Sequence, residues 1–177
     1  MAILRLPALG RQIVDVDEIY EYLKERGIYY DRWEADAEFA RTADSEAVLQ
    51  AYRSEVSALI SQGFSQVDVM SVNELTPDLD ALDDQFAREH THEDFEIRFF
   101  VEGEGVFFLN PGEGESLIEL RCVAGDLISL PRGLKHWFEM GDVRHFRCIR
   151  FFSHDKGWIP HYTGSDLNLK YRKQSSE

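Results

Sequence analysis

Three side chains that often bind metal ions lie within seven positions of the sequence: His90, His92 and Glu96. On an extended strand alternate residues point to one face, so the two histidines lie about 6.6 Å apart and can reach one ion. A straight strand would carry Glu96 roughly 13 Å further, too far for ligand bonds of about 2 Å. We therefore expect the chain to turn at Glu93 and Asp94, which would bring Glu96 back to the histidines.

The ligand types in this segment indicate which metals it could hold. Two neutral imidazoles and one carboxylate suit Fe(II), Ni(II), Mn(II) or Zn(II) better than Cu(I) or Ca(II). The alternative interpretation is a pair of surface histidines and a solvated Glu96 in a loop. A second segment decides between the two interpretations.

Residues 125–136 read GDLISLPRGLKH and resemble the second motif of the cupin superfamily, G-x5-P-x-G-x2-H. The first cupin motif is met by His90, His92, Glu96 and Gly103. The chain departs from these motifs at two places, where Asp84 replaces a glycine and Met140 replaces a frequent asparagine. The resemblance implies that His136 is a fourth metal ligand. It also implies a mainly β fold with flanking α-helices, built on a cupin-type antiparallel β-barrel or jelly roll.

Longer segments are similar to one cupin family, the acireductone dioxygenases. They read EHTH at 89–92, RFFVEG at 98–103, RCIRFF at 147–152 and GWIP at 157–160. The resemblance implies an enzyme that cleaves the ene-diol acireductone (1,2-dihydroxy-3-keto-5-methylthiopentene) with O2 in methionine salvage. It implies one Fe(II) or Ni(II) per chain. The Fe(II) form would give formate and 2-keto-4-methylthiobutyrate, and the Ni(II) form would give formate, CO and 3-methylthiopropionate.

Two arginines are candidates for holding the anionic substrate. Arg98 shares the strand parity of Glu96, so it points to the same face, where a buried cation needs an anionic partner. In the family the matching arginine is expected to bind the substrate, although a structural salt bridge is the alternative. Arg150 is the second candidate, because Arg147 and Arg150 point to opposite faces and only one can enter the site.

Four further residues complete the expected site. Phe86, Phe138 and Trp158 are candidates for an apolar wall around the methylthio group, with ordinary core packing as the alternative. Glu89 is a candidate for a hydrogen bond to a ligand histidine, or it is solvated. Two other functions stay open for the same residues, a zinc or manganese cupin sugar isomerase and a cupin binding module without enzyme activity.

Helices and strands that must position these residues follow from the hydrophobic pattern. Helical spacing and capping signals predict helices over 16–26, 44–63 and 77–86. Short aromatic and β-branched runs separated by turn residues predict strands after residue 94. These strands are expected over 96–101, 106–110, 117–123, 127–130, 136–140 and 145–152, with two more over 28–33 and 67–72. Turns are expected at 102–105 and at Gly141-Asp142.

Length and charge restrict the remaining function classes. The 177 residues are enough for one domain, expected as helical elements and first strands over 1–87, a metal-binding barrel core over 88–155 and a C-terminal tail over 156–177. The formal charge is −14, and residues 1–94 carry 21 acidic and 8 basic side chains. So acidic a chain disfavours nucleic-acid and membrane-surface partners. We expect a cytoplasmic monomer that binds a small substrate and O2.

Overall fold

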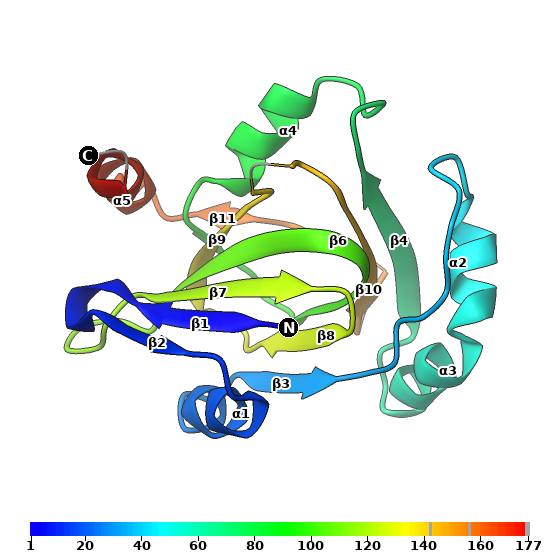
Figure 1. The fold of residues 1–177 in the computed structure, drawn as a ribbon, viewed down its shortest axis with the longest axis horizontal. Coiled ribbons are helices and arrows are strands. Elements are labelled where there is room, and N and C mark those ends of the chain that lie inside the picture. Colours follow the sequence, from blue (N-terminus) through cyan, green and yellow to red (C-terminus); the bar gives the residue numbers. More distant parts are fainter. Residues whose placement is uncertain (142, 156, 176–177) are drawn as a thin grey trace.

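Antiparallel strands form the centre of the molecule and helices lie outside them (Figure 1). The computed structural model describes residues 1–141, 143–155 and 157–175. The strands are β1 (Ile3–Leu6), β2 (Arg11–Ile13), β3 (Tyr29–Arg32), β4 (Gln66–Val72), β5 (His90–Thr91), β6 (Glu96–Asn110), β7 (Ile118–Val123), β8 (Asp126–Leu130), β9 (Lys135–Glu139), β10 (Phe146–Phe152) and β11 (His161–Tyr162). The helices are α1 (Val16–Lys24), α2 (Ser45–Ala51), α3 (Arg53–Ser61), α4 (Leu79–Phe86) and α5 (Leu167–Ser175), with a short 3-10 turn at Pro7–Leu9.

The long strand β6 belongs to two sheets and joins them. One sheet has the order β11-β5-β9-β6-β7-β1-β2, and the other runs β4-β10-β6-β8-β3. Every strand pair within the described residues is antiparallel. This arrangement confirms the predicted fold class, and it places β9 between β5 and β6.

The prediction of two separate strands with a turn at 102–105 was wrong, because β6 continues through this segment. Glu102 and Gly103 pair with β10, and Glu104 and Gly105 pair with β7. Gly103 has a φ of 70°, a left-handed conformation that glycine adopts without steric cost. The strand therefore bends sharply at Gly103 and passes from one sheet to the other instead of reversing.

The predicted helix over 44–63 is two helices, α2 and α3, which meet at Tyr52. Tyr52 leaves the helical conformation, with φ −111° and ψ 34°. Its ring is buried and packs edge-on against Phe99 of β6, with ring centroids 5.2 Å apart. The break lets both helices place apolar side chains on the curved sheet. The helices predicted over 16–26 and 77–86 are confirmed as α1 and α4.

Five strands and helices were not predicted, namely β1, β2, β5, β11 and α5. The last two lie in the segment that we expected to be a tail, and Tyr171 of α5 donates a hydrogen bond to Glu119 of β7 over 3.0 Å. Each is too short or too polar to show a clear period in the sequence. The other predicted strands are present within one or two residues of their expected ends. In the predicted Gly141-Asp142 turn, Asp142 lies outside the described residues, as do Lys156, Ser176 and Glu177 of the expected tail.

Alternation along β6 separates the site from the outer core. Ile97, Phe99 and Val101 belong to an apolar cluster with side chains of α2 and α3, whereas Phe100 belongs to a second cluster inside the barrel. Glu96 and Arg98 share the inner face with Phe100 because side chains alternate along a strand. Within the described part of the chain, no helix has the length and apolar character needed to cross a membrane.

Candidate metal centre

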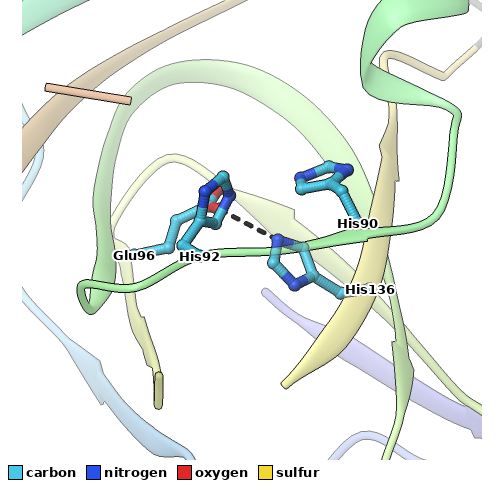
Figure 2. A group of neighbouring side chains, drawn as sticks. All are labelled: His90, His92, Glu96 and His136. Carbon is cyan, nitrogen blue, oxygen red and sulfur yellow. Dashed lines mark hydrogen bonds and ion pairs between the residues drawn. The ribbon is translucent and has the colours of Figure 1, made fainter. Parts of the chain in front are cut away.

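The four predicted ligands come together inside the barrel (Figure 2). His90 lies on β5, His136 is its partner on β9, and Glu96 begins β6. One ligand atom from each of these residues and from His92 lies within 4.8 Å of the others. All four side chains are buried, between 1 and 8% exposed, so the alternative of solvated surface histidines is wrong.

The chain turns where the spacing required it. Residues 93 and 94 form a bend between β5 and β6, which brings Glu96 back to the histidines. Glu96 Oε2 lies 2.8 Å from His92 Nε2 and 2.9 Å from His136 Nε2. The bend is held by Asp94, whose carboxylate accepts hydrogen bonds of 2.7 Å from the Ser153 amide and hydroxyl.

Each histidine is oriented by a backbone carbonyl. The Nδ1 atoms of His90, His92 and His136 lie 2.7, 2.7 and 2.8 Å from the carbonyl oxygens of residues 88, 159 and 134. A neutral imidazole carries one proton, and these contacts place it on Nδ1. The Nε2 lone pairs are then free to bind a metal ion.

The same tautomers leave acceptors facing acceptors at the centre of the cluster. Two Nε2 lone pairs point at a carboxylate oxygen less than 3 Å away, which is unfavourable unless a cation lies between them. Burial, followed by the effect of the neighbouring His136, lowers the pKa of His90 to about 3, so His90 is neutral at physiological pH. Three neutral nitrogens and one carboxylate fit a divalent transition-metal ion.

Arg98 provides the positive charge beside Glu96. Its Nη2 lies 2.7 Å from Glu96 Oε1, and its side chain is 1% exposed. Burial alone would raise the pKa of the Glu96 carboxyl, but the Arg98 guanidinium beside it outweighs this effect and holds the pKa well below its usual range. Arg98 Nε and Nη1 are buried and have no hydrogen-bond acceptor among the described residues. The guanidinium therefore has two donors left for an anion.

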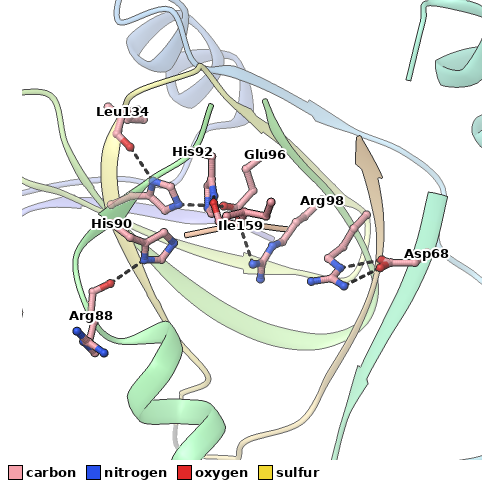
Figure 3. A network of polar contacts seen from close by, with 10 residues as sticks. Asp68, Arg88, His90, His92, Glu96, Arg98, Leu134 and Ile159 are labelled. Carbon is pink, nitrogen blue, oxygen red and sulfur yellow. Dashed lines mark hydrogen bonds and ion pairs between the residues drawn. The ribbon is translucent and has the colours of Figure 1, made fainter. Parts of the chain in front are cut away.

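Arg150 pairs with Arg98 across β10 and β6 and so shares its inner face, whereas Arg147 lies on the outer face. Figure 3 shows Arg98 beside Glu96, with the hydrogen bonds to Asp68 drawn as dashed lines. The carboxylate of Asp68 on β4 binds Arg150 through two hydrogen bonds of 2.8 and 2.7 Å. Arg147 contacts the ring of Phe39 instead, outside the barrel. The sequence analysis left open which arginine faces the site, and the register between β6 and β10 answers this question in favour of Arg150.

The three aromatic residues expected to form a wall are in contact with one another. Phe86 packs edge-on against Phe138 and Trp158, with centroid distances of 6.1 and 5.6 Å. The Trp158 ring also lies 5.4 Å from the His90 ring and 5.3 Å from the His92 ring. A cavity of about 160 Å³ opens beside His92 and Glu96, and of the three aromatic residues only Trp158 lines it. Their role toward a substrate stays a prediction.

The prediction that Glu89 forms a hydrogen bond to a ligand histidine is wrong, because no such bond is found among the described residues. All three Nδ1 atoms are bound to carbonyl oxygens, whereas the Glu89 carboxylate accepts hydrogen bonds from Asn110 Nδ2 at 2.9 Å and Thr163 Oγ1 at 2.7 Å. The His90 side chain joins the metal cluster, whereas the side chain of the preceding Glu89 contacts Asn110 and Thr163 instead. Adjacent strand residues face opposite sides, and this parity was available from the sequence.

Residues that the sequence analysis missed lie far from the ligands along the chain. Asp68 and the carbonyl of Ile159 are examples, since both reach the site only through strand pairing or the return of the C-terminal segment. The parity of Asp68 with Met70 was the one available signal for an inward position. No sequence signal identifies a backbone carbonyl as a hydrogen-bond acceptor.

Comparison with known proteins finds similarity to acireductone dioxygenases over most of the chain. The model of the ARD/ARD' family matches residues 9–160. The acireductone dioxygenase of Aquifex aeolicus is 43% identical over 166 residues, covering 93% of this chain and 90% of the relative. The acireductone dioxygenase of Methylococcus capsulatus is 42% identical, covering 88% and 83%.

A solved structure agrees with these sequence relatives. The acireductone dioxygenase from Bacillus anthracis, with a cadmium ion in its active centre, superimposes with a TM-score of 0.84 at 30% identity, over 92% of this chain and 98% of that one. The chain therefore belongs to the ARD/ARD' family.

Proposed function

We propose that this chain is a metal-dependent dioxygenase that cleaves the ene-diol acireductone with O2 in methionine salvage. The proposal is carried by one observation, a buried set of three histidines and Glu96 beside an arginine that has two free donors. The curated relatives named acireductone dioxygenase support the substrate. The cadmium in the Bacillus anthracis relative supports a metal at the corresponding position.

The charges of the site favour a dianionic substrate. Arg98 balances Glu96, and Asp68 balances Arg150, so the four side chains add no net charge. A divalent ion then leaves the site with two positive charges, which an ene-diol that has lost both protons would neutralise. An uncharged sugar lacks this complementarity, so this observation favours the dioxygenase over a sugar isomerase.

The protein's own groups would orient the substrate. A divalent metal ion held by His90, His92, Glu96 and His136 would supply Lewis acidity and a template for the two ene-diol oxygens. The free donors of Arg98, Nε and Nη1, would bind a substrate oxygen and stabilise its negative charge. Trp158 and Phe86 would cover the methylthio group and exclude water from the electron-rich substrate.

We propose Fe(II) or Ni(II) as the resident metal, one per chain. With Fe(II) the products would be formate and 2-keto-4-methylthiobutyrate, and with Ni(II) they would be formate, CO and 3-methylthiopropionate. We also propose that the chain acts as a monomer in the cytoplasm. Its strong net negative charge of −14 supports the monomer, because like charges keep copies apart.

Oxygen uptake tests the proposal. Protein loaded anaerobically with Fe(II) or with Ni(II) is mixed with the ene-diol, and O2 consumption and loss of the ene-diol absorbance are recorded together. We expect equal molar loss of O2 and substrate, with CO released only by the Ni(II) form. No O2 uptake by either form, with one metal bound per chain, would contradict the proposed function.

A further inference from the structure

Glu89 joins three segments of the chain at the metal centre. Its side chain is buried, and its carboxylate accepts a hydrogen bond from Asn110 at the end of β6 and another from the hydroxyl of Thr163. Its backbone carbonyl also accepts a hydrogen bond from the Thr163 amide at 3.1 Å. Among the described residues no cation forms an ion pair with this carboxylate, so it depends on these neutral donors.

Glu89 binds the end of a segment that covers the ligand histidines. We name residues Gly157–Thr163 the strap. Within the strap, the Ile159 carbonyl binds His92 Nδ1, and the ring of Trp158 lies against His90 and His92. Four strap residues line the cavity beside the metal centre, namely Gly157, Trp158, Ile159 and His161.

Other contacts also hold this end of the strap: the Arg88 guanidinium lies 3.8 Å from the centroid of the Tyr162 ring, and beyond the strap Asn168 Nδ2 donates a hydrogen bond to the Ala87 carbonyl at 2.6 Å. The ladder between β11 and β5 has two residue pairs, His161 with Thr91 and Tyr162 with His90. So short a ladder is weak on its own. The side-chain bond from Thr163 to the Glu89 carboxylate is charge-assisted, and such bonds are about twice as strong as neutral ones. It therefore adds a charge-assisted hydrogen bond to this attachment.

The other end of the strap is attached by a second carboxylate. Asp94 accepts hydrogen bonds from the amide and the hydroxyl of Ser153, just before the strap begins. Glu89 and Asp94 lie on either side of His90 and His92 in the sequence, so the two sides of the ligand segment are bound to the C-terminal end of the strap and to Ser153, four residues before the strap. A shift of the strap at either end would turn His92 through its bond to Ile159.

We propose that Glu89 is a positioning residue, whose bond to Thr163 holds the strap against the ligand histidines and slows the loss of the bound metal. The proposal rests on the proposed function only in requiring that the four side chains bind a metal ion. It assigns to Glu89 no contact with substrate or with the metal.

The test compares the release of Co(II) from the intact protein and from Thr163→Val. Valine has nearly the shape of threonine and keeps the backbone bond. The substitution removes the bond to the carboxylate, together with two longer contacts of the same hydroxyl, 3.4 Å from the Glu89 carbonyl oxygen and 3.2 Å from the Ser165 amide nitrogen. Hydrogen bonds to charged groups are among the stronger ones in proteins, and we expect part of the free energy of this bond to be transmitted to the metal site. The rate of Co(II) transfer to excess chelator should rise about tenfold, and the visible spectrum of the bound Co(II) should change.

Two variants separate positioning from other effects. Thr163→Ser keeps the hydroxyl and should release Co(II) at close to the original rate. Thr76→Val is the matched control, because it removes a threonine hydroxyl that accepts a hydrogen bond from the Asn73 amide in the turn before α4. It should also leave the rate of Co(II) release unchanged.

Glu89→Gln shows whether the negative charge of Glu89 alone is responsible for slow metal release. If Glu89→Gln speeds metal release and Thr163→Val does not, the carboxylate acts by its charge and the positioning role is wrong. A rate for Thr163→Val equal to that of Thr76→Val would also overturn it. The intact protein separates the two proposals, because failure to consume O2 while holding Co(II) tightly contradicts the proposed function and leaves this inference standing.

Discussion

Replacement of Arg98 by methionine tests the electrostatic account of the site at its most buried charge. Methionine fills a similar volume and removes the guanidinium. Two donors of Arg98 are free for substrate, and a hydrogen bond to a charged group contributes about 1.5–3 kcal/mol, so the variant should lose about 3–6 kcal/mol of transition-state binding. This corresponds to a fall in kcat/KM of about 10²- to 10⁴-fold.

The same substitution should destabilise the metal-free protein. Without Arg98, the buried carboxylate of Glu96 loses the cation 2.7 Å away. Removal of one partner of a buried ion pair costs about 3–5 kcal/mol. Urea unfolding of the metal-free variant should show this loss. Metal binding should reduce the loss, because the ion itself then neutralises the carboxylate.

Arg98→Lys separates the two roles. Lysine can pair with Glu96 but lacks the planar fork that reaches a second acceptor. We expect Arg98→Lys to recover most of the stability and little of kcat/KM, measured by O2 consumption with Fe(II)-loaded protein. If Fe(II)-loaded Arg98→Met keeps kcat/KM within twofold of the original, the free donors do not bind substrate and the reasoning is refuted.

Three further substitutions or conditions test the fold and the site. The pKa of His90 is about 3 in the folded protein and about 6.5 in the unfolded protein, so the unfolded state binds a proton first as the pH falls. Relative to His90→Gln, the metal-free protein should therefore lose about 2 kcal/mol of its free energy of unfolding between pH 7 and pH 5. Equal pH dependence of the two proteins in urea unfolding would contradict this expectation. Asp68→Asn leaves Arg150 unpaired inside the barrel and should lower the free energy of unfolding by about 1–2 kcal/mol, measured by thermal unfolding. Adding Arg150→Gln to this variant should restore part of the lost stability. A double variant as unstable as Asp68→Asn would show that the ion pair does not stabilise the fold. Gly103→Ala would place a methyl group on the backbone of His145 at a left-handed φ and should lower stability by at least about 2 kcal/mol; a soluble variant of unchanged melting temperature would show that β6 can relax there.

The ligand set could be predicted because its information is local. His90, His92 and Glu96 lie within seven residues, and strand geometry alone required a turn between them. His136 required the resemblance to a second motif, since nothing in its own surroundings links it to the first. The inward direction of Arg98 followed from its parity with Glu96.

The features that were missed depend on contacts between distant parts of the chain. The polar, glycine-containing residues 102–105 are typical of a turn, yet they pair on both sides within β6 because Gly103 bends the strand. The break at Tyr52 depends on its packing against Phe99. The attachment of Glu89 to Thr163 joins residues 74 positions apart, and no local pattern reveals it.

The central claim is that His90, His92, Glu96 and His136 hold one metal ion. Metal content per chain, measured for the purified protein and for the four single alanine variants after equal loading with Fe(II) or Ni(II), tests it most directly. We predict close to one ion per chain in the original protein and strong depletion in every variant. One ion per chain retained in all four variants would contradict the account.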